Sequence, residues 1–371
     1  MELINLSKIK KLSQLKTKKN NLVITLYLNT NRRHDFQESY HTVFKDMLKE
    51  ILSENISSSN DLKKDLKKIE KFINFEFSKK AKGLVIFSCV KENIWQVLEL
   101  PVEVYNQYFL AHHPYIKPLL RILEDYDNFC VLLIDKEKSR IFSVYLGVIQ
   151  EHLDVFDKVK GKHKQGGSSE ARFQRHHEEE VKNHIKNVSQ KLYSFFKRNK
   201  FDYLIIGYTT PEIWSYLENA LPSQLKERII GKFDVEIFAS PQKILEKVNL
   251  LEKKIKKEKE KKLVDNFFNN LSYKKRAVSN LDDIINEIKE GRIDILIIDK
   301  SLAKKGYECL NCGYLTIWPS KECPICHFRM RTLKDIVEKM IKIALEKNVK
   351  INFVDNKKLR KIGGIGAVLR F

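Results

Sequence analysis

Long apolar runs are missing from this sequence, and so is a secretory leader. No stretch approaches the roughly 18 consecutive apolar residues that a membrane-spanning helix needs. The N-terminal segment, MELINLSKIKKLSQLKTKK, is basic and loosely amphipathic, without the continuous apolar block or small-residue cleavage site of a signal peptide. The sequence also contains no internal repeat and no long disordered tract. It therefore predicts a soluble, cytoplasmic protein with no membrane partner.

Acidic residues are scarce relative to basic ones. The 371 residues include 69 Lys and Arg against 48 Asp and Glu, for a formal net charge of +21. This excess favours nucleic acid as the partner, because phosphate neutralisation releases counterions. The alternative is a lysine-rich surface that only keeps the protein solvated. A hydrophobic fraction of 43% is enough for folded cores, and the length suggests two or three domains.

Strand-like and helix-like segments alternate along the chain, which predicts a mixed α/β (α+β) fold. The first domain, residues 1–126, contains apolar strand patterns at Leu22–Thr30 and at GLVIFSCV, separated by helical segments. The second domain, residues 127–262, contains two or three antiparallel strands, a long helix and the charged connector Glu252–Lys262, which we interpret as a hinge. The third domain, residues 263–371, has a buried strand (RIDILIID) followed by a cysteine-rich insertion. Apolar residues recur on one face of the long helix: Phe173, Val181, Ile185, Val188, Leu192 and Phe195.

Four of the six cysteines form two Cys-x-x-Cys pairs, YECLNCG and KECPICH. Each pair lets two thiolates converge on one point, and two such pairs complete a tetrahedral Zn²⁺ site. The predicted ligands are Cys309, Cys312, Cys323 and Cys326. Because four protein ligands leave no coordination position open, we expect the zinc to be structural. A redox Cys-x-x-Cys is the competing interpretation, but redox chemistry needs only one pair.

The remaining cysteines and a neighbouring histidine are interpreted as structural. His327 directly follows the last predicted ligand, and we interpret it as a bystander rather than a further ligand. Cys89 and Cys130 lie in apolar strand patterns, which predicts buried thiols. Cysteines in the reduced state, without disulfides, also fit a cytoplasmic location.

A glycine pair lies in the lysine-rich segment GKHKQGGSSEARFQR, directly before the long helix. Glycine adopts φ > 0 and lets a backbone enter a narrow space, and the flanking cations suit contacts with phosphates. A loop that enters an RNA-walled cavity is one interpretation, and an ordinary surface turn is the other. The candidate RNA-binding residues are Lys160, Lys162, Lys164, Gln165, Gly166, Gly167, Ser168, Ser169, Arg172 and Arg175.

This loop and the helix after it resemble the central loop of the archaeal and eukaryotic class-one release factor and pelota superfamily. The family pattern is a basic segment, Gly-Gly-Gln, Ser, and then Arg-Phe-x-Arg at the start of a long helix. The closing GGIGAVLRF resembles the superfamily's C-terminal strand, and some members have a small zinc-binding insertion in the last domain. The first domain matches mainly through LVITLYLNTN, which is similar to a divergent bacterial and archaeal branch that includes Balon-like ribosome hibernation factors. The residues that match the loop pattern are Gly166, Gly167, Ser169, Arg172, Phe173 and Arg175.

The resemblance implies three domains that together mimic the shape of tRNA. The first domain would face the decoding centre, and the loop of the second would reach the peptidyl-transferase centre. The last domain would dock a translational GTPase of the EF-Tu type. The implied partners are therefore the ribosome, through rRNA in its A site, and that GTPase, with the protein itself a monomer.

Two departures from the family pattern bear on activity. Ser168 stands where the family has its catalytic glutamine, and neither Gln165 nor Gln174 is in register with that position. The first domain contains no Asn-Ile-Lys-Ser element, with which release factors inspect a stop codon. We therefore expect an A-site occupant that acts in hibernation or rescue without decoding a stop codon, and we favour a non-enzymatic role.

Two alternatives stay open. One is a codon-independent peptidyl-tRNA hydrolase whose catalytic loop is Gly166, Gly167 and Ser168, since the family's backbone amide at this position also helps to organise water. The other is a stand-alone RNA-binding or nuclease protein that uses Asp135 and Asp202 as metal-binding carboxylates. A turn signal around Asp135 and the position of Asp202 at the start of a strand favour structural roles for both.

Overall fold

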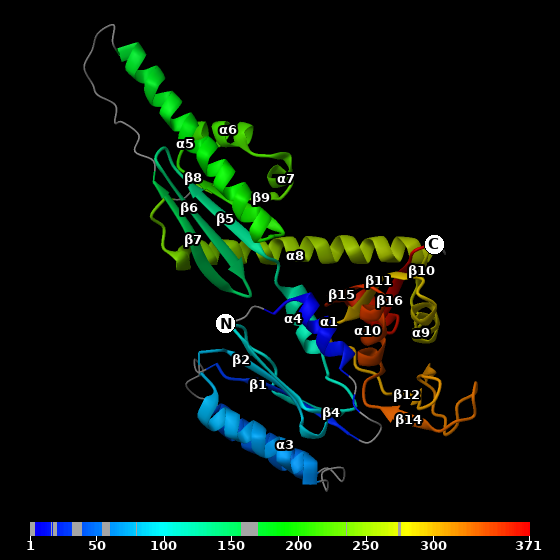
Figure 1. Ribbon diagram of the computed structural model, residues 1–371. Coiled ribbons are helices and arrows are strands. Elements are labelled where there is room, and N and C mark those ends of the chain that lie inside the picture. The colour runs from blue at the N-terminus through cyan, green and yellow to red at the C-terminus, as the bar shows by residue number, and fades with distance from the viewer. Residues whose placement is uncertain are drawn as a thin grey trace. The chain divides into compact units, whose positions relative to one another are not determined.

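The computed structural model describes residues 4–15, 17, 21–31, 39–53, 60–78, 80–156, 170–234, 236–273 and 276–371 (Figure 1). The chain forms two compact units. The central unit is Tyr126–Lys256, and the composite unit combines Met1–Asp125 with Lys257–Phe371. The mixed α/β fold class is confirmed, whereas the division into domains at residues 126 and 262 stays a prediction.

The central unit is a five-stranded sheet with helices on both faces (Figure 1). The strand order is β7-β6-β5-β8-β9, in which β5, β8 and β9 are parallel to one another and β6 is antiparallel to β5 and β7. The strands are β5 (Phe129–Ile134), β6 (Lys138–Tyr145), β7 (Val148–Phe156), β8 (Tyr203–Tyr208) and β9 (Ile229–Asp234). The helices are α5 (Glu170–Arg198), α6 (Pro211–Ala220), α7 (Ser223–Lys226) and α8 (Pro241–Ser272), and α8 continues into the composite unit.

Side chains alternate in direction along β5, which explains why this unit has two cores. Cys130 and Leu132 pack with α5, α6 and α7 on one face, while Val131 and Leu133 pack with the first part of α8 on the other. Successive side chains of a strand point to opposite faces, so a strand covered on both sides becomes apolar throughout. Every residue of β5 is buried, as its uninterrupted apolar sequence indicates.

In the composite unit, the N-terminal segment contributes an antiparallel sheet of order β3-β2-β1-β4. Ile24, Leu26 and Leu28 of β1 pack against α2 and α3, and the predicted strands at Leu22–Thr30 and GLVIFSCV are confirmed as β1 and β2. The strands are β1 (Val23–Asn29), β2 (Gly83–Cys89), β3 (Ile94–Leu100) and β4 (Gln107–Ala111). The helices are α1 (Leu6–Gln14), α2 (Tyr40–Ser53), α3 (Asn60–Lys71), which continues into a π-helical turn (Phe72–Glu76), and α4 (Lys117–Asp125).

The C-terminal segment contributes a second sheet, of order β10-β16-β11-β15, in which only β11 and β15 are parallel. A Cβ atom at Gly366 would collide with the ring of Phe267, so this strand of the GGIGAVLRF motif needs a glycine where it meets α8. The strands are β10 (Ala277–Val278), β11 (Ile293–Asp299), β15 (Lys350–Val354) and β16 (Ile365–Leu369). The helices are α9 (Leu281–Glu290), α10 (Ile336–Glu346) and α11 (Lys357–Lys361).

The cysteine-rich insertion lies between β11 and α10 and forms its own small antiparallel sheet, β13-β12-β14. Its strands are β12 (Gly306–Cys309), β13 (Leu315–Thr316) and β14 (Met330–Leu333). No helix in the described part of the chain is long and apolar enough to cross a bilayer. Even α8, with 32 residues, carries charged residues over most of its length, including the connector Glu252–Lys262.

Candidate metal centre and RNA-facing loop

The four predicted ligands come together at one point of the insertion. The Sγ atoms of Cys309 and Cys326 are 3.4 Å apart, those of Cys312 and Cys323 are 3.5 Å apart, and all four lie within 4.8 Å of one another. Four sulfurs bound at about 2.3 Å to one tetrahedral ion would be separated by about 3.8 Å. The spacing therefore fits a single metal ion of that size.

The two Cys-x-x-Cys turns have the same backbone design. The N–H of Gly313 donates to the carbonyl of Cys309 at 3.1 Å, and the N–H of His327 donates to that of Cys323 at 2.9 Å. Backbone N–H groups also point at the first sulfur of each turn, as from Asn311 to Cys309 Sγ at 3.4 Å. Such donors stabilise thiolates, the form in which cysteine binds a metal.

His327 has a structural role at the end of the second turn. It adopts φ +54°, and Gly313 occupies the equivalent place in the first turn at φ +72°. This left-handed conformation reverses the chain after each second cysteine. His327 is exposed and is not part of the ligand group, in agreement with the sequence analysis. Cys89 and Cys130 are buried free thiols, as predicted.

The glycine loop follows β7 and precedes α5. Its candidate residues from Lys160 to Ser169 lie outside the described part of the chain, so their role stays a prediction. The two arginines of the site lie on the first turns of α5, where both are exposed. Arg172 and Arg175 are three residues apart, a spacing that places two helical side chains on one face.

The N-terminal part of α5 differs from the rest of that helix. The described side chains from Arg172 to Glu180 include none that is buried, and Val181 is the first buried residue. The predicted apolar face from Val181 to Phe195 packs on the central sheet, whereas the side chain of Phe173 lies outside the described residues. Figure 1 shows this end of α5 extending beyond the sheet of its unit. Ten residues of helix span about 15 Å, so α5 carries the loop on a stalk of that length.

The two carboxylates of the nuclease alternative have structural partners. Asp135 Oδ1 accepts the backbone N–H groups of Glu137 at 2.8 Å and Lys138 at 2.6 Å, which closes the turn between β5 and β6. Asp202 Oδ2 accepts the N–H of Asn128 at 3.0 Å. Neither belongs to a metal-binding group among the described residues. These contacts support the structural roles that the sequence favoured.

Known families match most of the chain beyond the first sheet. Residues 114–253 match the family described as "Bacterial archaeo-eukaryotic release factor family 10", and residues 258–371 match "eRF1 domain 3". The second match contains the four cysteines, and the first contains the glycine loop with α5.

The chain is also similar to curated proteins and to solved structures. Peptide chain release factor subunit 1 of Thermococcus sibiricus is 24% identical over 285 residues, covering 69% of each chain. The protein with the same description from Archaeoglobus fulgidus is 24% identical over 332 residues, covering 78% of each chain. Among solved structures, Archaeoglobus fulgidus Pelota matches with 15% identity, 80% coverage of both chains and a TM-score of 0.34. S. cerevisiae Dom34 matches with 9% identity, coverage of 80% of this chain and 83% of that one, and a TM-score of 0.43.

The two family matches are consecutive along the chain, and the release factor relatives span the boundary between them. The Gly-Gly loop sequence before α5 and the closing GGIGAVLRF strand both fall inside these matches. The chain therefore belongs to the superfamily of archaeal and eukaryotic class-one release factors and pelota, in a divergent bacterial branch.

Proposed function

We propose that this protein binds the ribosome as a release-factor-like translation factor and occupies the A site without decoding a stop codon. Its role would be in ribosome hibernation or rescue. One observation carries the proposal: a release-factor-type loop in which Ser168 replaces the catalytic glutamine while Gly166 and Gly167 are kept. The loop is thus equipped to reach the peptidyl-transferase centre but lacks the side chain associated with hydrolysis.

The stalk of α5 supports delivery of the loop to a confined site. A helix that projects beyond its own sheet by about 15 Å can enter a space too narrow for the whole unit. Arg172 and Arg175 are exposed on that stalk, where they can contact the phosphates of rRNA. The lysines ahead of the glycine pair add further cations next to the same point. Sequence-independent phosphate contacts of this kind hold a protein in position on RNA.

We further propose that the four-cysteine cluster binds one Zn²⁺ with a structural role. Four thiolates are a donor set that zinc accepts in tetrahedral geometry, and the observed sulfur separations fit it. The ion would hold the two turns of the insertion together, because this small sheet buries few apolar side chains. A monomer whose last domain, residues 263–371, docks a translational GTPase of the EF-Tu type completes the proposal, on the basis of the family resemblance.

The key experiment measures release of labelled peptide from ribosomes that carry peptidyl-tRNA and an empty A site, with and without a stop codon. We expect the unmodified protein to cosediment with these ribosomes and to release little peptide. Serine is too short to place a polar group where the glutamine amide would lie, and one transition-state hydrogen bond is worth on the order of 10²–10³ in rate. Ser168→Gln should therefore increase release by up to that factor, whereas the matched control Ser169→Gln should not.

The other outcomes discriminate between the alternatives. Rapid release by the unmodified protein in the absence of a stop codon would refute the occupant and support the codon-independent hydrolase. Release that requires a stop codon would mean that the first domain recognises the stop codon. Failure to cosediment, combined with cleavage or binding of free RNA, would favour the stand-alone RNA-binding or nuclease protein.

A further inference from the structure

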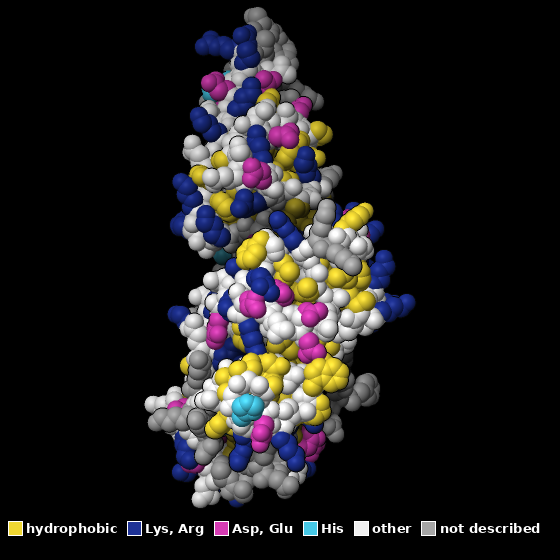
Figure 2. Space-filling view, turned by 90° about the vertical axis from the view of Figure 1, so that its right-hand side faces the viewer, with side chains coloured by type: hydrophobic (Ala, Val, Ile, Leu, Met, Phe, Trp, Pro, Cys, Tyr) yellow, Lys and Arg dark blue, Asp and Glu magenta, His cyan; other side chains and the backbone are white. Residues whose placement is uncertain are grey.

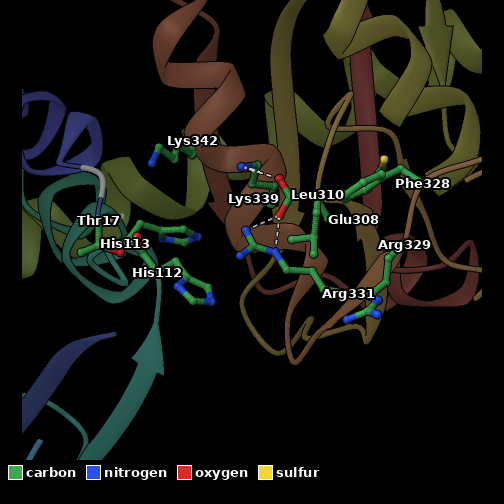
Figure 3. Close-up of a pocket in the computed structure, with 11 residues that line it drawn as sticks. Thr17, His112, His113, Glu308, Leu310, Phe328, Arg329, Arg331, Lys339 and Lys342 are labelled. Carbon is green, nitrogen blue, oxygen red and sulfur yellow. Dashed lines mark hydrogen bonds and ion pairs between the residues drawn. The ribbon is translucent and has the colours of Figure 1, made fainter. Parts of the chain in front are cut away.

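A pocket of about 550 Å³ opens in the composite unit beside the four-cysteine cluster (Figure 3). One wall is formed by His112 and His113, which directly follow β4. The facing wall comes from β12, β14 and α10, with Glu308, Arg331 and Lys339 among its side chains. Small-molecule sites typically have volumes of about 300–1,000 Å³. The pocket therefore has the size of a site for one small molecule.

The lining of this pocket is strongly cationic. Arg329, Arg331, Lys339 and Lys342 line it together with Cys309 and a single carboxylate, Glu308, so its basic side chains outnumber its carboxylates by three. Glu308 is already neutralised: its Oε2 accepts Arg331 Nε at 2.9 Å, and its Oε1 pairs with Lys339 Nζ at 2.7 Å (Figure 3). A cavity with excess charge of one sign concentrates ligands of the other. The pocket therefore favours an anion.

The two imidazoles offer acceptors on the opposite wall. Nδ1 of His112 donates to the carbonyl of Asn21 at 3.0 Å, and Nδ1 of His113 donates to that of Pro114 at 3.1 Å. Both rings point toward the facing wall in Figure 3, which leaves their Nε2 atoms for a ligand. Burial, together with the nearby Lys342 and Lys339, lowers the pKa of His113 to about 4. A neutral Nε2 accepts hydrogen bonds, so this wall suits the hydroxyl groups of a ligand.

An apolar edge completes the lining. Phe328 is 46% exposed and Leu310 is 41% exposed, and both belong to the insertion. Exposed aromatic and aliphatic side chains next to cations suit the flat face of a heterocyclic base, against which aromatic rings stack. The pocket thus combines cations, hydroxyl acceptors and a stacking surface within one cavity.

We propose that this pocket binds a nucleoside phosphate. The phosphate lies against Arg329, Arg331 and the lysines of α10, which are three residues apart and share one helical face. The sugar hydroxyls donate to the histidine wall, and the base packs on Phe328. This site lies outside the glycine loop and does not depend on the ribosomal role proposed above.

The test uses the full-length protein and calorimetric titration with adenosine 5′-monophosphate, pyrophosphate and a single-stranded oligoadenylate. Guanosine, cytidine and uridine monophosphates cover the other bases. We expect a mononucleotide to bind saturably at one site and pyrophosphate to compete with it. No saturable binding of any mononucleotide would overturn the proposal. Binding of the oligonucleotide that free nucleotides do not displace would also overturn it, because the pocket would then belong to an RNA surface.

Two exposed residues give variants that should fold normally. Arg329→Gln should weaken both the nucleotide and pyrophosphate about tenfold, since it removes a charge-assisted phosphate contact. Phe328→Ala should weaken the nucleotide about tenfold and leave pyrophosphate unchanged, because only the base stacks. The matched control is Arg198→Gln, an exposed arginine of α5 with the same change of charge. Equal effects of Arg329→Gln and Arg198→Gln would show that net charge, and not the pocket, governs binding.

Discussion

Glu338 joins two segments of the composite unit that are more than two hundred residues apart along the chain. It lies on α10, and its carboxylate accepts the backbone N–H groups of Ile116 at 2.8 Å and Lys117 at 3.0 Å at the start of α4. These are donors that a helix start leaves without intrahelical partners, so Glu338 caps α4 from another part of the chain. Beside it, Lys117 Nζ and Asp335 form a partly buried ion pair at 2.7 Å.

Burial raises the pKa of Glu338 to about 7 from its usual 4.5, which makes this contact sensitive to pH. The folded state holds the proton more tightly than the unfolded state does. The stability from this group is therefore complete below about pH 4.5 and is lost as the pH rises through about 7. This rise in the pKa of Glu338 corresponds to a free energy on the order of 3 kcal/mol.

We expect Glu338→Gln to remove this dependence, because glutamine has no charge to bury and its amide oxygen still accepts one of the two backbone N–H groups. Hydrogen exchange of peptides from α4 and α10, compared between the wild type and Glu338→Gln at matched pH, measures this pH dependence. From pH 5 to pH 8, exchange in the wild type should accelerate relative to the variant. An unchanged ratio across this range would show that Glu338 does not titrate there.

At the scale of the element, the insertion formed by β12, β13 and β14 depends on its cysteines. Its buried apolar cluster contains Met330 besides cysteines, so the sheet has little hydrophobic stabilisation of its own. We expect about one zinc ion per chain in the wild type and nearly none in Cys312→Ser, with rapid hydrogen exchange across residues 306–333. Cys89→Ser, at a buried thiol outside the cluster, is the control and should keep its zinc. Metal analysis that finds no zinc in the wild type, or equal zinc in both variants, would contradict the metal site.

At the scale of the whole molecule, only part of the net charge of +21 should set the affinity for the ribosome, namely the cations that contact phosphates. Figure 2 shows Lys and Arg spread over one face among Asp and Glu rather than gathered in a single patch, so position matters more than total charge. Each phosphate contact contributes roughly 0.7–0.9 to the slope of log affinity against log salt. Replacing Lys160, Lys162 and Lys164 with Ala should therefore lower that slope by about two to three in cosedimentation.

The matched control for the salt experiment removes the same charge elsewhere. Lys253, Lys254 and Lys257 are exposed on α8, and their replacement with Ala should leave the slope nearly unchanged. Equal losses in the two triple variants would assign the attraction to net charge alone. Binding that added salt does not weaken would argue against phosphate contacts altogether.

The sequence by itself determined the local features of this protein. The apolar patterns at Leu22–Thr30 and GLVIFSCV predicted two strands, and the apolar face of α5 from Val181 to Phe195 followed from its helical spacing. The four cysteines were assigned to one site from their paired spacing alone. These predictions succeed because secondary-structure periodicity and short chelating turns depend on residues that are close in sequence.

Only the tertiary structure decided which distant segments meet. Residues 1–125 join residues 257–371 in one unit, and the capping of α4 by Glu338 depends on that union. The nucleotide-sized pocket likewise brings His113 near Lys339 and Lys342, although no local pattern selects any of them. A side chain's role in such a site follows from burial and from neighbours across the fold, which sequence periodicity does not encode, and packing of the two sheets with α4 and α10 supplies both.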